Sequence, residues 1–273
     1  MEKLSGINVN TNINSNLSKQ IFDSNTNTDK SLFTDDLPAN NNIPINGKLD
    51  LDFRQGTKTG DCELLSLLLS MKDKTSGKKF LESLLSYNEN ENSITVNLKS
   101  QNESYTFTKD ELSKYNALST GDGDIRAIEL AMAKHLYEQK ENKDEKFSPE
   151  KLLSGISSYK TLNILTGDRK ISTYKNLDSL IDDFGNQDRF FQLSFFQTTD
   201  NPESDEVVLK SHIALNPNTH IYHPIFCNHS YSIINSDKDS IYLRNPHDSS
   251  DVLKVKRSII KDANGIVTCN RLE

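Results

Sequence analysis

The hydrophobic pattern changes character near residue 150, and this change constrains the fold more than any other feature. Before it, apolar residues recur at helical spacing in runs such as CELLSLLLSM and DIRAIELAMAKHL, which is typical of helices with a buried face. After it come strand-like runs such as RFFQLSFFQT, HSYSII and SIYLRN. Helices followed by strands predict an α+β fold, with a helix-rich lobe over residues 49–150 and a β-rich lobe over residues 151–273.

Each half also contains elements of the other type. The runs SITVNLKS and SYTFTKD alternate as half-buried strands do, so a hairpin is expected within the helix-rich half. In the second half, SPEKLLSGI and NLDSLIDDFG predict short helices, the first with a proline at its first position.

Residues 1–48 form a separate compositional zone, rich in Asn, Ser and Thr with few apolar side chains. Such a segment cannot bury enough surface to offset its ordering entropy, so a disordered polar leader is expected. It has no apolar segment typical of a cleaved signal peptide. Three interpretations stay open: a tail without a role, a segment that docks on the domain, or a secretion leader, which a secretion chaperone would bind.

Composition narrows the function classes. The net charge of -7 provides no basic footprint for nucleic acid, and the longest apolar runs are far below the ~20 residues of a membrane span. Three cysteines without a CxxC pair predict no disulfide framework and a reducing compartment. We expect no cofactor and a cytoplasmic location, or secretion without a cleaved signal peptide into a host cell as a virulence effector.

Cys62 stands between a Gly-Asp pair and a leucine-rich run. Asp61 suits the N-cap of a helix whose leucines anchor it in the core. A free cysteine there could pack as a small apolar side chain. It could equally be a nucleophile, since the positive end of a helix stabilises a thiolate.

A cysteine nucleophile needs a base, and the base needs an orienting group. His229 opens the alternating run HSYSII, and the next run, SIYLRN, ends at Asn245 before Pro246. If these runs are adjacent antiparallel strands, His229 and Asn245 lie close together, and the amide of Asn245 can hold the imidazole in one tautomer.

These residues resemble the calpain-like branch of the papain-type cysteine peptidases. QGTKTGDC is similar to that family's Gln-Gly…Gly-Asp-Cys nucleophile segment, NHSYSI to its His-Ala-Tyr-Ser-Val segment, and IYLRNPHD to its Leu-Arg-Asn-Pro-Trp segment. IRAIELAMAKH and SSYKTLNILTGD resemble two further stretches between them. The resemblance therefore runs in order from about residue 55 to residue 248.

The resemblance implies a papain-like core with a helical lobe that carries the cysteine and a β-rich lobe that carries the histidine and asparagine. Cys62 would be the nucleophile, His229 the general base and acid, and Asn245 the orienting residue. Gln55 would donate to the oxyanion together with the backbone N–H of Cys62. The implied activity is endopeptidase cleavage of a protein substrate. Calcium dependence does not carry over, because nothing resembles a calpain's calcium-binding domains.

Three positions depart from the family pattern. Glu63 and His247 stand where the family has tryptophan, and Gln55 precedes Cys62 by seven residues where six is usual. We expect His247 to cover the histidine–asparagine pair in place of the indole. The extra residue predicts a bulge in the segment TKT.

Other functions remain open. The same fold hosts glutamine deamidases and acyl transferases that use the same thiolate and base, and a degenerate core could serve as a non-catalytic protein-binding module. HIYHPIFCNH also contains zinc-ligand types at His220, His223, Cys227 and His229, although their spacing fits no standard site. A zinc ion there would use His229 and exclude it from catalysis.

Overall fold

The computed structural model describes residues 43–56, 58–141, 145–167, 171–174, 177, 179–195, 208–215, 217, 222–226, 228–262 and 265–272. All of them fall in one compact unit, Ala39–Glu273. The elements in the first part of this unit are α2 (Cys62–Lys72), α3 (Thr75–Ser83), β1 (Leu85–Asn88), β2 (Ser93–Leu98), η2 (Lys99–Gln101), β3 (Glu103–Thr108), α4 (Lys109–Ser113), α5 (Gly123–Glu138), α6 (Pro149–Leu153) and α7 (Ser158–Thr166). Those that follow are β4 (Ile171–Tyr174), α8 (Ser179–Phe184), β5 (Arg189–Phe195), β6 (Val208–Leu215), β7 (Tyr222–Phe226), β8 (His229–Ser236), β9 (Ser240–Asn245), β10 (Asp248–Lys256), α9 (Arg257–Asp262) and β11 (Ile266–Arg271).

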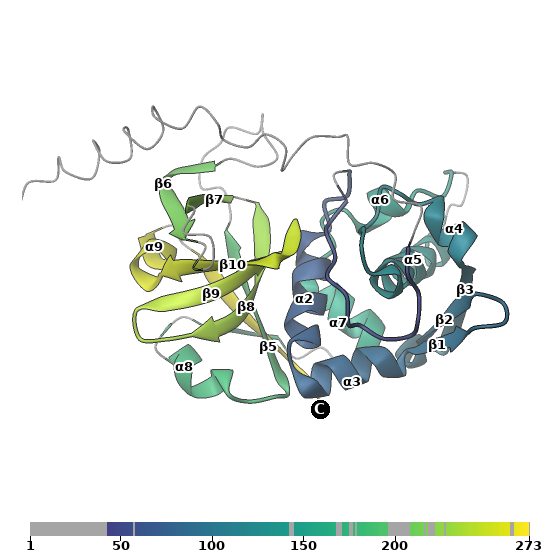
Figure 1. Cartoon of the computed structure of the whole chain (residues 1–273), viewed down its shortest axis with the longest axis horizontal. Helices are drawn as coiled ribbons and strands as arrows, with labels where there is room; N and C mark the ends of the chain where they lie inside the picture. Colours follow the sequence, from purple (N-terminus) through teal and green to yellow (C-terminus); the bar gives the residue numbers. More distant parts are fainter. Residues whose placement is uncertain are drawn as a thin grey trace, which may run out of the picture. The chain divides into compact units, whose positions relative to one another are not determined.

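The architecture is α+β, as the change of hydrophobic pattern predicts (Figure 1). One core cluster gathers the apolar side chains of α2, α3, α5 and the first three strands, and a second gathers those of the large sheet. The first cluster also includes Leu153 of α6 and Leu162 of α7. The helix-rich lobe thus extends past the expected boundary at residue 150, because these two short helices bury their apolar faces against the other helices.

The start of the packed region also differs from the expected boundary. Most of the predicted leader, residues 1–42, lies outside the described residues, so its disorder and its role in secretion stay predictions. Ile43 and Ile45, however, are only 2% and 7% exposed and belong to the helix-rich core. The composition of residues 1–48 is polar on average, so it gives no sign of these two buried isoleucines, which flank Pro44.

Helix α2 is buried along nearly its whole length, from Leu64 to Met71. It packs against α3 and α7 as well as against β5 and β8, so it separates the two core clusters (Figure 1). Its leucines contribute to the helix-rich core. Ser66 and Ser70, four residues apart and therefore on one helical face, contact β5, where the Ser70 hydroxyl accepts the backbone N–H of Phe191 at 2.8 Å.

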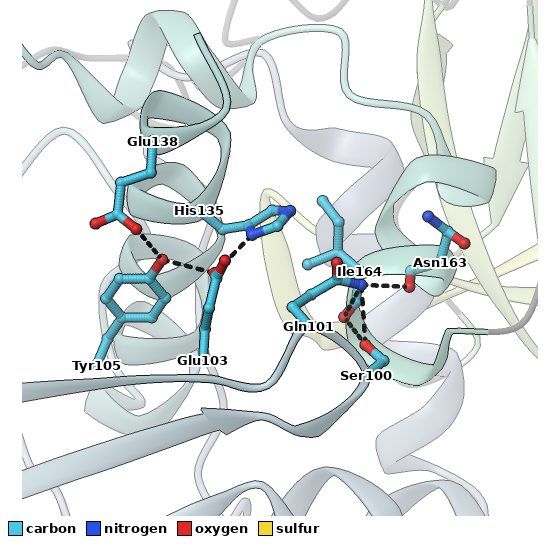
Figure 2. A network of polar contacts seen from close by, with 8 residues as sticks. All are labelled: Ser100, Gln101, Glu103, Tyr105, His135, Glu138, Asn163 and Ile164. Carbon is cyan, nitrogen blue, oxygen red and sulfur yellow. Dashed lines mark hydrogen bonds and ion pairs between the residues drawn. The ribbon is translucent and has the colours of Figure 1, made fainter.

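The predicted hairpin is present as β2 and β3, which pair antiparallel, with β1 added at the edge. Figure 2 shows how this small sheet is joined to α5. Glu103 on β3 lies 2.7 Å from Nδ1 of His135, and the Tyr105 hydroxyl lies between Glu103 and Glu138, at 2.8 and 2.9 Å. In the same view, the Ser100 hydroxyl donates to the carbonyl of Ile164 and so joins η2 to α7.

The large sheet of the described residues has eight antiparallel strands in the order β4-β11-β5-β8-β9-β10-β6-β7. Strands β8 and β9 are adjacent, with Ser232 opposite Arg244. Each step back along β8 is a step forward along β9, so position 229 falls level with position 247, just beyond the end of β9. No helix in the described part of the chain is long and apolar enough to cross a membrane.

Candidate active site

Cys62 is the first residue of α2, where backbone N–H groups have no partner within the helix. Its Sγ lies 4.0 Å from the carbonyl oxygen of Asn228, the residue that precedes His229. Gln192 of β5 holds this end of the helix, because its Nε2 donates to the Glu63 carbonyl at 2.8 Å and to the Ser66 hydroxyl at 2.6 Å. The cysteine of the helix-rich lobe and the residue that precedes β8 thus lie close together across the lobes.

His229 and Asn245 meet, as the strand pattern predicts. Nε2 of His229 lies 2.8 Å from Oδ1 of Asn245, and the backbone N–H of His247 donates to the same oxygen at 3.1 Å. Because only an oxygen can accept the backbone N–H, the amide orientation is fixed, and Nε2 must carry the proton that it shares with Oδ1. In the neutral ring, Nδ1 is then the basic nitrogen.

Aromatic rings enclose the imidazole of His229, which is 2% exposed. The His247 ring stacks on it, with centroids 4.6 Å apart and planes 19° apart. Tyr231 and Phe226 meet the ring edge-on, at 4.8 and 6.2 Å. His247 therefore covers the ring in the place where the resembled family has tryptophan, and this ring stacking agrees with the expectation for it.

The turn that precedes β8 has an uncommon backbone. Asn228 has φ of 53°, in the left-handed region that asparagine tolerates better than most side chains. This conformation accompanies the approach of its carbonyl to Cys62. Asn228 and Gln192 were not singled out from the sequence; an asparagine directly before the histidine was the available signal for the turn, and nothing marked Gln192.

Asp61 occupies the N-cap position of α2, but its side chain does not cap the helix. The carboxyl group is fully buried, and neither oxygen has an N–H or O–H donor. Burial raises the pKa of Asp61 well above its usual range, and the neighbouring carboxylate of Glu129 raises it further. The expected side-chain cap is therefore wrong: the carboxyl group lies beside Glu129, and its raised pKa favours the protonated form.

Glu129 is the acceptor of this buried pair. It lies on α5 and is fully buried, and it accepts the backbone N–H of Ser119 at 3.2 Å and the Ser119 hydroxyl. Burial raises the pKa of Glu129 as well, whereas its contacts with Asp61 and Ser119 lower it. The raised pKa values favour one proton shared by the two carboxyl groups over two negative charges, one residue before Cys62.

Glu63, the residue after the cysteine, is directed away from that pair. Its Oε2 accepts the backbone N–H of Ser158 at 2.9 Å, at the first residue of α7. A carboxylate at a helix N-terminus is favourable because it satisfies an otherwise unpartnered N–H group and complements the helix dipole. Glu63 therefore joins the start of α2 to the start of α7.

Gln55 is 6% exposed and lies in the loop that leads to Cys62. Its Nε2 donates to the carbonyl of Thr59 at 2.6 Å, and its buried Oε1 has no partner. Residue 57 lies outside the described residues, but the Thr59 N–H donates to the Gly56 carbonyl at 3.3 Å. The bulge in TKT therefore stays a prediction, as does a donor role for Gln55 toward an oxyanion.

The alternative zinc site lies mostly outside the described residues, because His220, Cys227 and the side chain of His223 are not among them. Where side chains are described, no group of three or more His, Cys, Asp or Glu could hold a metal ion. At His229, Nε2 is engaged with Asn245.

No known family model matches the sequence, and no curated protein matches it. Among solved structures, the chain is similar to one described as a putative C39-like peptidase from Bacillus anthracis, with 17% identity and a TM-score of 0.24. The match covers 42% of this chain and spans 58% of the length of that one. A likeness of this extent carries no argument about this chain, so the function proposed below is argued from the residues of this chain alone.

Proposed function

We propose that this protein is a cysteine peptidase that uses Cys62, His229 and Asn245. The observation that carries the proposal is the hydrogen bond of 2.8 Å between Nε2 of His229 and Oδ1 of Asn245, next to Asn228, whose carbonyl oxygen lies 4.0 Å from Sγ of Cys62 at a helix N-terminus. The Asn245 amide assigns the proton to Nε2 and leaves Nδ1 to take the thiol proton. The calpain-like resemblance of the surrounding motifs supports the same assignment.

The reaction would begin with attack of the Cys62 thiolate on a peptide carbonyl carbon. The carbonyl oxygen becomes an oxyanion, which the N–H groups at the start of α2 stabilise. The imidazolium of His229 then gives its Nδ1 proton to the leaving amine as the C–N bond breaks, and an acyl-enzyme remains. Water that gives a proton to His229 attacks the acyl group, and cleavage of the C–S bond restores the thiolate and imidazolium.

The two parts of the site differ in exposure, and this suits the proposed roles. The imidazole of His229 is held by its hydrogen bond to the Asn245 side-chain amide and by the stacked His247 ring. Cys62, by contrast, is partly exposed and accessible to a substrate. A group that must transfer protons in a fixed direction is thereby kept in one orientation.

The test is labelling with an epoxide inhibitor of cysteine peptidases, followed by intact-mass measurement. One adduct is expected on Cys62, with no adduct in Cys62→Ala and slow labelling in His229→Ala. Cys269→Ala is the matched control, since it removes a buried cysteine in β11 and should label normally. If the inhibitor labels Cys62 no faster than it labels a simple thiol, the cysteine is not activated and the proposed enzyme function is wrong.

A second measurement distinguishes peptidase chemistry from the deamidase and acyl-transferase alternatives. Wild-type protein is incubated with a mixture of denatured proteins, and new amino termini are sequenced by mass spectrometry. New termini that disappear with Cys62→Ala support the peptidase. Labelling without new termini, together with conversion of glutamine to glutamate or with transferred acyl groups, would contradict it.

A further inference from the structure

An extended segment, residues 52–55, lies between the two lobes and contacts both; we call it the strap. On one side, Arg54 exchanges both backbone hydrogen bonds with Thr120, at 2.9 and 2.8 Å. Thr120 lies just before α5, so these bonds fix the strap to the helix-rich lobe. The residues on either side of Arg54 present their backbone groups in the opposite direction, as in a strand with a partner on each edge.

The opposite edge of the strap contacts the start of β10 and the turn that precedes it. The Phe53 N–H donates to the Ser249 hydroxyl at 2.9 Å, and the Ser249 N–H donates to the Phe53 carbonyl at 3.2 Å. The Gln55 N–H donates to the Pro246 carbonyl at 2.8 Å. Phe53 and Ser249 are buried, at 1% and 0% exposure, so a lost partner could not be replaced by bulk water.

Side chains extend the same contact at its rim. An ion pair of 2.6 Å joins Arg54 to Asp248, and the Ser249 hydroxyl, which accepts from Phe53, donates to Asp52 at 3.3 Å. Ser249 thus uses its donor and its acceptor on two strap residues. This makes it the side chain on which the contact between the lobes at this point most depends.

The turn held by the strap begins at the residue after Asn245. Asn245 orients His229, and the ring of His247 in the same turn covers it. Seven residues after Gln55, the chain reaches Cys62. The strap is therefore joined by a short chain to the cysteine and by hydrogen bonds to the residues that hold the histidine.

We propose that the strap aligns the His229–Asn245 pair with Cys62, and that Ser249 is a positioning residue for the reaction. This inference rests on the proposed function. Displacement of the turn would shift the imidazole relative to the sulfur without removing any group that reacts. A loss of alignment would therefore appear as slower chemistry at Cys62 rather than as weaker substrate binding.

The test measures alkylation of Cys62 by iodoacetamide at mildly acidic pH, where a simple thiol is almost unreactive and a thiolate paired with imidazolium reacts. The thiolate displaces iodide from the carbon of the reagent, so no substrate is needed. Ser249→Ala removes the acceptor of the Phe53 N–H and should slow acidic alkylation about tenfold. In unfolding buffer, all variants should react at the same rate.

Ser70→Ala is the matched control. The Ser70 hydroxyl also accepts a buried backbone N–H across the lobes, at 2.8 Å, but near the opposite end of α2 from Cys62. This substitution should lower the melting temperature by a similar amount and leave the acidic alkylation rate within about twofold of wild type. An equal loss of alkylation in both variants would show that general destabilisation is responsible, and would overturn the inference.

A charge exchange provides a test that does not require removal of a buried group. Asp248→Arg places two guanidinium groups together and should slow alkylation, whereas the double variant Arg54→Asp with Asp248→Arg should recover part of the rate. If the double variant does not recover any of the rate, the proposed aligning role of the strap is contradicted. If wild-type protein itself shows no alkylation at acidic pH, the proposed function is wrong. If wild type reacts and Ser249→Ala reacts at the same rate, only the proposed role of the strap is wrong.

Discussion

Asp122 provides a quantitative test of the electrostatics at the start of α5. It is 1% exposed and caps that helix, with Oδ1 accepting the backbone N–H of Asp124 at 2.9 Å and of Ile125 at 3.4 Å. Its other carboxylate oxygen is buried without a partner. Burial and, second, the charge of Asp124 raise the pKa of Asp122 from 3.8 to about 7.

The consequence for stability has a definite sign. In the unfolded chain Asp122 loses its proton near pH 4, whereas in the folded protein it keeps the proton up to about pH 7. The folded state therefore binds more protons in this range, and stability falls as pH rises through it. The full difference corresponds to about 4 kcal/mol, which is reached above about pH 7.

The substitution Asp122→Asn keeps a capping oxygen at this position but removes the titrating group. Relative to wild type, the variant should have similar stability near pH 4 and be more stable by about 2–4 kcal/mol near pH 8. Urea unfolding followed by circular dichroism, at a series of pH values, measures this difference. Asp124, whose pKa burial raises to about 6, is present in both proteins, so its direct contribution largely cancels.

Asp237→Asn is the control with the opposite sign. Backbone N–H groups of Asp239 and Ser240 lower the pKa of the exposed Asp237 carboxylate. Its stabilisation is present above the unfolded pKa and is lost as pH falls, so this variant should be less stable than wild type at neutral pH. A difference in stability between Asp122→Asn and wild type that does not change with pH would contradict a raised pKa at Asp122.

Two further predictions concern the residues around Cys62 and the His229–Asn245 pair. His247→Ala exposes the face of the His229 ring and should slow inhibitor labelling up to about tenfold, whereas His247→Trp should stay within about twofold of wild type. Equal labelling rates in His247→Ala and wild type would contradict the covering role of His247. Asp61→Asn keeps a donor toward Glu129 and should retain the melting temperature, but Glu129→Leu leaves the Ser119 N–H and hydroxyl without an acceptor and should lower the unfolding free energy by about 2–3 kcal/mol. Thermal unfolding of the three proteins checks this, and equal losses in both variants would argue against a shared proton.

Local pattern was sufficient to predict the elements that carry the site. The leucine-rich run predicts α2, and the alternating runs before and after residue 237 predict β8 and β9 as neighbours. Since Pro246 ends the second run, the contact between His229 and Asn245 follows from the antiparallel pairing. The stacking of His247 is predictable for the same reason, because the register places it level with His229.

What the sequence could not provide depends on partners distant along the chain. Aspartate is a residue type that often caps helices, so Asp61 is predicted as a cap. In the fold, however, α5 brings the Glu129 carboxylate beside it, and this tertiary contact outweighs the capping preference of aspartate. The strap is held largely by backbone groups, which leave no signature in side-chain composition, and one of its edges contacts a residue nearly 200 positions away along the chain. Strand β1 was also missed, since Leu84 and Leu85 continue the helical spacing of α3.

The proposed function requires that Cys62 and His229 form a reactive thiolate–imidazolium pair. The most direct measurement is an ultraviolet titration of the thiolate, taken as the difference between wild-type protein and Cys62→Ser, repeated in His229→Ala. We expect the thiolate signal of wild type to persist in acid, well below the pH of ~8.5 at which a free cysteine titrates, and we expect His229→Ala to move the loss of the signal back toward that pH. A wild-type signal that appears only in alkaline solution, unchanged by His229→Ala, would contradict the pair and the proposed peptidase with it.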